Sequence, residues 1–216
     1  MAPEDQSKFM IVVEAATSRD GLDRVAAVLE ATDVAALLIA PAGQVPLDAA
    51  TAKPLVDLAK AKSVTALLMG DARLARALGA DGVHVPWGKD ATVRYGEARE
   101  VLGDSFVVGA DAGRSRHDGM SFGEAGADYV GFGIPEHVED RETARARRLS
   151  LIEWWSEIFE VPCVAFDVET TQEAAALARA GADFVTVGVP RDLSAAELSR
   201  WAQELADALK AHEAAA

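Results

Sequence analysis

The chain of 216 residues contains one cysteine, Cys163, so an internal disulfide and a cysteine-based metal cluster are both excluded. No apolar run approaches the roughly 18 residues that a membrane-spanning helix requires, so no membrane association is expected. The stretch 1–8 is polar and lacks the apolar core of a signal peptide. These absences together predict a cytoplasmic protein.

Basic residues are also in the minority. The chain has 21 Lys and Arg against 35 Asp and Glu, which gives a formal net charge of −14. Such a surface repels phosphate backbones at long range, so a nucleic acid is not expected as a partner. A small phosphorylated ligand remains compatible with this charge, because a local pocket can oppose the overall field. A solvated acidic surface is the simplest interpretation of the remaining negative charge.

Short apolar runs recur along the chain with longer amphipathic segments between them. Each run is continuous rather than alternating, which is typical of strands buried on both faces of a parallel sheet. Eight runs are predicted as strands: 9–13, 34–39, 64–69, 82–85, 106–108, 129–132, 162–166 and 184–187.

The intervening segments carry helix signals. Leu22, Val25, Ala26 and Leu29 follow a helical spacing. Capping boxes, in which a Ser or Thr precedes a Glu by three residues, predict helix starts at three places. They lie at Ser150–Glu153, Thr170–Glu173 and Ser194–Glu197.

An internal repeat supports the same alternation. Gly-Ala-Asp followed by an apolar run occurs at 79–83, 126–130 and 181–185, where the glycine suits the left-handed end of a helix. Eight such alternations imply right-handed crossovers and, at this length, a single (β/α)8 TIM barrel over residues 1–216. The alternative is an open, doubly wound sheet. Against it, residues 14–18 read Glu-Ala-Ala-Thr-Ser, which lacks the glycines of a dinucleotide-binding turn.

One connection is unusually long. Residues 135–148 are highly charged and have no apolar face. Long loops in compact domains are often mobile lids, and a merely solvated loop is the other interpretation.

Several of these segments resemble the thiamine phosphate synthases and the related thiazole tautomerases. The stretch Gly126–Gly133, which reads Gly-Ala-Asp-Tyr-Val-Gly-Phe-Gly, is similar to the sixth-strand motif of that family. Residues 67–70 with 77–85 resemble its third helix and fourth strand, and 161–166 with 180–183 its seventh and eighth units. The resemblance covers roughly residues 34–190.

The resemblance implies a barrel enzyme that joins a pyrimidine diphosphate to a thiazole phosphate, with Mg²⁺ held by two aspartates. Hard oxygen ligands suit Mg²⁺, because the ion neutralises the departing diphosphate. Asp71 and Asp90 are therefore the candidate Mg²⁺ ligands, although each stands one residue later than the family's aspartate.

Other positions depart further from the family. Asp167-Val168 stands where the family has Gly-Gly, and Val189 replaces its strand-eight serine. Ile134 stands where a tautomerase has histidine. The departures lie at the carboxyl ends of the strands, where barrels carry their chemistry. Ordinary synthase activity is therefore not expected.

Charged and aromatic residues nevertheless remain at the predicted strand ends. The strongest catalytic candidates are Asp111 and Asp167, which directly follow apolar runs, and a cluster of these two with Asp71 and Asp90 could bind a cation or share a proton. His84 is a third catalytic candidate, and a core histidine is its competing interpretation. For the aspartates, the competing interpretation is helix capping. The candidate ligand-binding residues are Trp87, Lys89, Arg114, Gly188 and Arg191.

Two functions follow from this pattern. The first is a divergent enzyme of the thiamine phosphate synthase type that binds a small heterocyclic or phosphorylated ligand. The second is a non-catalytic binding or regulatory barrel, since this fold hosts many functions. Trp154, Trp155 and Trp201 are expected to pack on the outside of the barrel or at a contact between subunits of a homo-oligomer.

Overall fold

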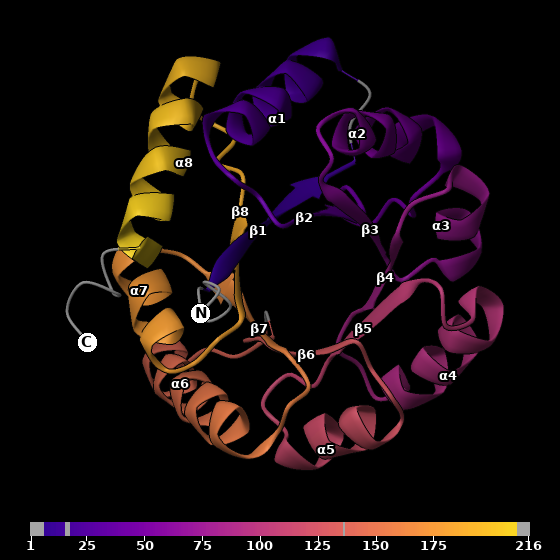
Figure 1. Ribbon diagram of the computed structural model, residues 1–216, viewed down its shortest axis with the longest axis vertical. Helices are drawn as coiled ribbons and strands as arrows, with labels where there is room; N and C mark the ends of the chain where they lie inside the picture. Colours follow the sequence, from indigo (N-terminus) through magenta and orange to yellow (C-terminus); the bar gives the residue numbers. More distant parts are fainter. Residues whose placement is uncertain (1–6, 16–17, 136, 211–216) are drawn as a thin grey trace, which may run out of the picture.

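The protein is a closed barrel of parallel strands surrounded by helices. A computed structural model describes residues 7–15, 18–135 and 137–210, which leaves most of the polar stretch 1–8 outside the described residues. The strands follow one another around the barrel in chain order, β1 to β8, and β8 pairs with β1 (Figure 1). The predicted (β/α)8 barrel is therefore confirmed, and the open doubly wound sheet is wrong.

Each predicted apolar run overlaps one strand. The strands are β1 Lys8–Glu14, β2 Ala36–Ala40, β3 Thr65–Met69, β4 Gly82–Val85, β5 Val107–Asp111, β6 Tyr129–Phe132, β7 Cys163–Val168 and β8 Phe184–Gly188. The helices are α1 Arg19–Ala31, α2 Ala49–Ala61, α3 Ala72–Leu78, α4 Ala91–Leu102, α5 Arg116–Glu124, α6 Arg141–Ile158, α7 Thr171–Arg179 and α8 Ala195–Lys210.

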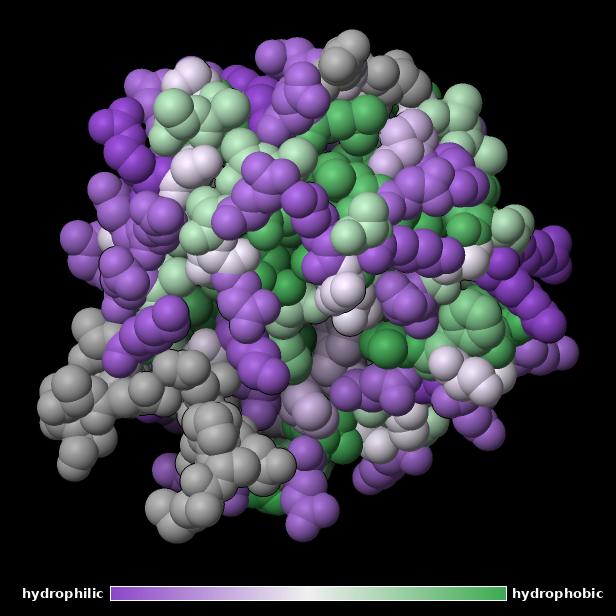
Figure 2. Space-filling view, turned by 45° about the horizontal axis from the view of Figure 1, so that its top comes forward, coloured by the Kyte–Doolittle hydropathy of each residue, from purple (hydrophilic) through white to green (hydrophobic). Residues whose placement is uncertain are grey.

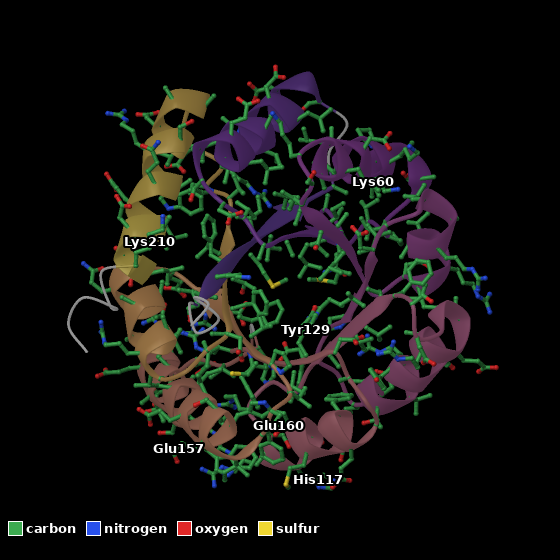
Figure 3. The ribbon with its side chains drawn as sticks, viewed as in Figure 1. Lys60, His117, Tyr129, Glu157, Glu160 and Lys210 are labelled. Carbon is green, nitrogen blue, oxygen red and sulfur yellow. The ribbon has the colours of Figure 1, made fainter. Side chains whose placement is uncertain are left out.

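Large side chains fill the inside of the barrel. Tyr129 and Phe166 pack there with Met10 and Leu38 in a cluster separate from the core between sheet and helices. Figure 3 shows Tyr129 inside the ring of strands, while Lys60, His117 and Lys210 lie on the surrounding helices. A side chain at Gly131 would lie 2.7 Å from the Phe166 ring, so this glycine makes room for it. The outer surface in Figure 2 is mostly polar, with apolar residues visible toward its middle.

The aspartates of the Gly-Ala-Asp repeat have a shared structural role. Asp81, Asp128 and Asp183 each accept a hydrogen bond from the backbone of the preceding strand, from Ala66, Val108 and Cys163, all at 2.7 Å. The preceding glycines have positive φ, as the sequence predicts. The repeat therefore joins consecutive strands at the amino-terminal end of the barrel.

The prediction for residues 135–148 is partly wrong. Glu136 lies outside the described residues, but α6 begins at Arg141, so most of the charged stretch is helix rather than loop. Asp140 is the N-cap of α6, and the predicted start at Ser150 lies inside this helix. In the first turns of α6, arginine side chains form ion pairs where an apolar face would otherwise pack. A search for hydrophobic periodicity does not detect such a helix.

The other helix predictions hold. At Ser194 both bonds of the capping box form, and at Thr170 the hydroxyl accepts a hydrogen bond from the Glu173 amide. Trp155 is buried, whereas Trp154 and Trp201 are partly buried against the outer core. Within the described residues, no helix is both long and apolar enough to cross a membrane.

Candidate functional site at the barrel mouth

Two carboxylates meet at the carboxyl ends of the strands. Asp111 ends β5 and Asp167 lies near the end of β7, on either side of β6. A Cβ at Gly133, just after β6, would lie 3.0 Å from Oδ2 of Asp111 and 2.8 Å from Oδ2 of Asp167. The absence of a side chain at Gly133 therefore lets both carboxylates approach the same point of the mouth.

The environment of Asp111 changes its proton affinity. Burial raises its pKa to about 7, and the charge of Asp167 acts in the same direction. Hydrogen bonds from the backbone of Gly113 and Gly133 oppose this rise, and the former measures 2.7 Å. A carboxyl group with this pKa populates both protonation states at neutral pH, which suits a general acid or base.

Asp167 adopts an unusual backbone conformation. Its φ is +59°, and the register between β7 and β8 shifts between Ala165 and Val168. The family resemblance aligns this position with a glycine, which adopts such a φ without strain. The side chain is exposed, and its Oδ2 accepts a hydrogen bond from the Ile134 amide at 2.7 Å.

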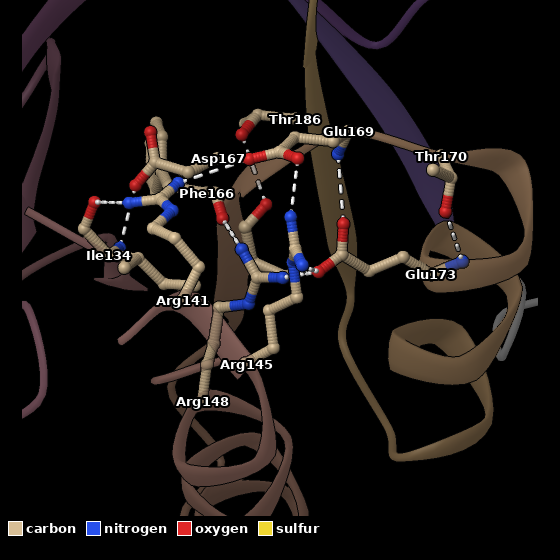
Figure 4. A network of polar contacts seen from close by, with 11 residues as sticks. Ile134, Arg141, Arg145, Arg148, Phe166, Asp167, Glu169, Thr170, Glu173 and Thr186 are labelled. Atoms are coloured by element: carbon tan, nitrogen blue, oxygen red, sulfur yellow. Dashed lines mark hydrogen bonds and ion pairs between the residues drawn. The ribbon is translucent and has the colours of Figure 1, made fainter. Parts of the chain in front are cut away.

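A buried ion pair supports the chain on both sides of Asp167 (Figure 4). Arg148 of α6 is fully buried and donates hydrogen bonds to the Phe166 carbonyl and to Glu173. Glu173 in turn accepts a hydrogen bond from the Glu169 amide at 2.9 Å. We call Arg148 and Glu173 the clamp, because together they hold the residues that flank Asp167.

The sequence interpretation missed this clamp. Arg141 and Arg145 of α6 also pair with Glu169. Arg141, Arg145 and Arg148 are spaced four and three residues apart, so they lie on one helix face. This spacing is the signal that could have identified the clamp.

His84 lies deep in the barrel, below the two carboxylates. It is 1% exposed, its Nδ1 lies 2.9 Å from the Tyr129 hydroxyl, and its ring stacks on Phe166 at 4.5 Å. Burial lowers its pKa to about 3, and the positive charge of Arg94 acts in the same direction. This arrangement supports the core interpretation of His84, which leaves its catalytic role a prediction.

The candidate ligand-binding residues fall into separate groups. Trp87 and Lys89 line a cavity of about 200 Å³ that also reaches Asp111. Trp87 is 42% exposed, and its ring centroid lies 5.3 Å from that of His137. Arg114 is partly buried, and its carbonyl accepts hydrogen bonds from Arg147.

Gly188 and Arg191 belong to a different part of the mouth. They line a cavity of about 460 Å³ between the ends of β1 and β8. Arg191 forms an ion pair with Glu14 there. The structure therefore does not bring the five predicted binding residues into one cavity.

The predicted magnesium ligands have other roles. Asp71 is the N-cap of α3 and accepts a hydrogen bond from the Leu74 amide at 2.8 Å. Asp90 forms an ion pair with Arg94 at 3.1 Å and makes no capping hydrogen bond. Among the described residues, no three acidic, histidine or cysteine side chains gather as they would to hold a metal ion. The cluster of four aspartates therefore does not form among these residues. Asp71 and Asp90 stay predicted Mg²⁺ ligands, since that ion is commonly held by one or two carboxylates together with water and a ligand phosphate.

Comparison with known proteins places this geometry in a family context. Residues 9–189 match the family model described as thiamine monophosphate synthase, which extends the resemblance back to the first strand. A thiamine-phosphate synthase of Rhodospirillum centenum is 39% identical over 166 residues, which are 75% of this chain and 77% of that protein.

Two further synthases are matched over a smaller share of their length. The protein from Erythrobacter litoralis is 42% identical over 63% of this chain and 63% of its own length. The protein from Hyphomonas neptunium is 42% identical over 60% of this chain and 58% of its own length. The chain thus spans less than two thirds of these two relatives.

Solved structures share the fold at low identity. Thiamine phosphate pyrophosphorylase from Pyrococcus furiosus superposes with a TM-score of 0.74 at 18% identity, covering 97% of this chain and 98% of that one. A tryptophan synthase chain from Mycobacterium tuberculosis reaches 0.76 at 14% identity, covering 95% and 93%. At these identities the likeness supports the barrel architecture alone.

Proposed function

Because the chain belongs to the thiamine monophosphate synthase family, we propose that it is an enzyme that transfers a proton on a small heterocyclic ligand bound at the mouth of its barrel. One observation carries this proposal. Asp111, with a pKa raised to about 7, faces the carboxylate of Asp167 across Gly133. A carboxyl group of that kind both accepts and donates a proton near neutral pH.

The cavity beside Asp111 favours a ligand with one ring. Its volume of about 200 Å³ lies below the roughly 300 Å³ at which sites for drug-sized ligands begin. The indole of Trp87 offers a face for stacking on a heterocycle. Lys89 lines the same cavity and supplies a hydrogen-bond donor.

The proposed step is balanced within the site. The ionised Asp111 carboxylate takes a proton from a C–H or N–H of the ring, and the electrons of that bond stay in the ring. The protonated carboxyl group then returns a proton to the same or another ring atom. The nearby Asp167 charge raises the basicity of Asp111 and so favours the first half of the step.

The coupling reaction of the named relatives is the second candidate. It is favoured by the 39–42% identity to proteins called thiamine-phosphate synthase. In the family resemblance this reaction depends on Mg²⁺ and a diphosphate. Asp71 and Asp90 already have partners in the chain, so we assign no step to a metal.

Two assays distinguish these functions. Hydrogen–deuterium exchange of thiazoles and pyrimidines, followed by NMR in D₂O, tests proton transfer directly. Synthase turnover with a pyrimidine diphosphate, a thiazole phosphate and Mg²⁺ tests the second candidate. We expect exchange in the wild-type protein, its loss in Asp111→Asn and its retention in Asp104→Asn, an exposed control.

The outcomes separate enzyme from binding module. Synthase turnover without ring-proton exchange would replace the first candidate by the second. Binding of a heterocycle with neither reaction would refute both and leave the non-catalytic barrel. Exchange that persists at the wild-type rate in Asp111→Asn would refute the role of Asp111.

A further inference from the structure

The carboxylate of Asp167 lies where a bound anion would otherwise interact with the backbone. Its Oδ2 accepts a hydrogen bond from the Ile134 amide, just past the end of β6, and rests over Gly133. Backbone N–H groups that line a concave site are common receptors for the phosphate and carboxylate groups of ligands. In this chain, the Asp167 carboxylate already accepts the hydrogen bond of the Ile134 amide.

A cationic side chain from α6, that of Arg141, contacts the same residue, Ile134. Nη1 of Arg141 donates to the Ile134 carbonyl at 3.2 Å, so the Arg141 guanidinium and the Asp167 carboxylate both bind to Ile134 (Figure 4). An arginine next to an available backbone N–H is a strong receptor for an anion. Glu169 also pairs with Arg141 at 3.2 Å. Asp167 and Glu169 therefore supply from within the chain the negative charge that this receptor would otherwise take from a ligand, and Asp167 is the one that binds the Ile134 amide.

The surrounding structure holds Asp167 in the conformation that this contact requires. A left-handed φ such as +59° is strained for an aspartate and persists only where neighbouring contacts enforce it. The clamp provides those contacts, since Arg148 binds the Phe166 carbonyl and Glu173 binds the Glu169 amide. The backbone is thus held on both sides of Asp167.

We propose that Asp167 is a resident anion that excludes phosphate and carboxylate groups from the β6–β7 side of the mouth. The part of the ligand that faces this side is accordingly neutral or cationic. This inference deepens the proposed function by naming the ligand class, and it rests on that function only in taking the mouth as the ligand site. A titration with phosphate measures binding alone, so a failed turnover assay and a failed binding test remain distinguishable.

The test removes the carboxylate and relieves the strain in one change. Asp167→Gly is titrated with inorganic phosphate by calorimetry, beside the wild type and two controls. Ser63→Gly relieves the other positive φ of a non-glycine residue in the described chain, just before β3 at the opposite end of the barrel. Asp104→Gly removes one exposed charge elsewhere.

We expect Asp167→Gly to bind phosphate about 10- to 100-fold more tightly than the wild type, the range of one regained charge-assisted hydrogen bond. Neither control is expected to change the dissociation constant more than about twofold. Asp167→Asn, which keeps the acceptor and removes the charge, is expected to lie between wild type and Asp167→Gly. Near-UV circular dichroism of each variant checks that the barrel is folded.

The proposal is overturned if neither Asp167 variant binds phosphate more tightly than the wild type. It is equally overturned if Asp104→Gly or Ser63→Gly gains as much as Asp167→Gly, because the gain would then follow from overall charge or from strain. If Asp167→Gly fails to fold, the comparison of Asp167→Asn with the wild type decides the outcome in the same terms.

Discussion

Replacing Asp111 by asparagine should stabilise the protein at alkaline pH and leave it unchanged at acid pH. Burial and the charge of Asp167 raise the pKa of Asp111 from 3.8 to about 7 in the folded state. A raised pKa means that the folded protein holds this proton more tightly than the unfolded chain. The resulting stability is present below about pH 4 and is lost as the pH rises toward 7.

The magnitude follows from the change in pKa. A rise from 3.8 to about 7 corresponds to about 4 kcal/mol at full ionisation, since each tenfold change in proton affinity is about 1.4 kcal/mol. Asparagine carries no charge and still offers an oxygen to the Gly113 amide, which binds Asp111 at 2.7 Å. Asp111→Asn should therefore approach a gain of about 4 kcal/mol at pH 8.

Urea unfolding at pH 4, 6 and 8 measures this difference. The gap between variant and wild type should widen steadily with pH, while the exposed control Asp104→Asn should keep an almost constant gap. A gap that does not change with pH, or a variant that is less stable than the wild type at pH 8, would refute the reasoning. Either result would mean that the Asp111 carboxylate is well stabilised in its ionised form.

Three further predictions concern residues around the site. Arg148→Met removes half of a buried ion pair and should cost about 3–5 kcal/mol in urea unfolding. Arg147→Met removes only an exposed contact to the Arg114 carbonyl and should cost about 1 kcal/mol or less. Asp183→Ala leaves the first amide of β7 without its acceptor and should cost about 1–3 kcal/mol by the same measurement. The His84 imidazole, whose pKa burial lowers to about 3, should show constant NMR shifts between pH 8 and 5; a titration in that interval would contradict its burial.

Much of the fold follows from local sequence signals. The apolar runs and the Gly-Ala-Asp repeat locate every strand, because strands buried on both faces must be continuously apolar. The proximity of Asp111 and Asp167 was also predictable, since parallel strands end at the same face of a barrel. The direction of the side chains was not predictable. Asp71 and Asp90 lie at the same face, but Asp71 caps its own helix and Asp90 pairs with Arg94.

Local sequence signals do not predict polar contacts between residues that are far apart in the chain. Arg148 and Glu173 lie on different helices, and their pairing depends on how α6 and α7 pack around the barrel. The charged stretch before Arg148 has no apolar periodicity, so the sequence predicts a loop where the structure has a helix. Hydrophobic patterning identifies elements that bury apolar faces, and α6 begins with ion pairs instead.

The cost of this arrangement indicates that it serves the mouth rather than stability. Asp167 is exposed, carries a strained φ, and lies beside another carboxylate whose pKa it raises. Glycine at position 167 would remove both the strain and the repulsion between the two carboxylates. The chain instead supports this residue with Arg148, a fully buried arginine whose desolvation is itself costly. Where local strain and a buried charge are maintained together at the functional end of a barrel, the retained group is best explained by what it does to the ligand.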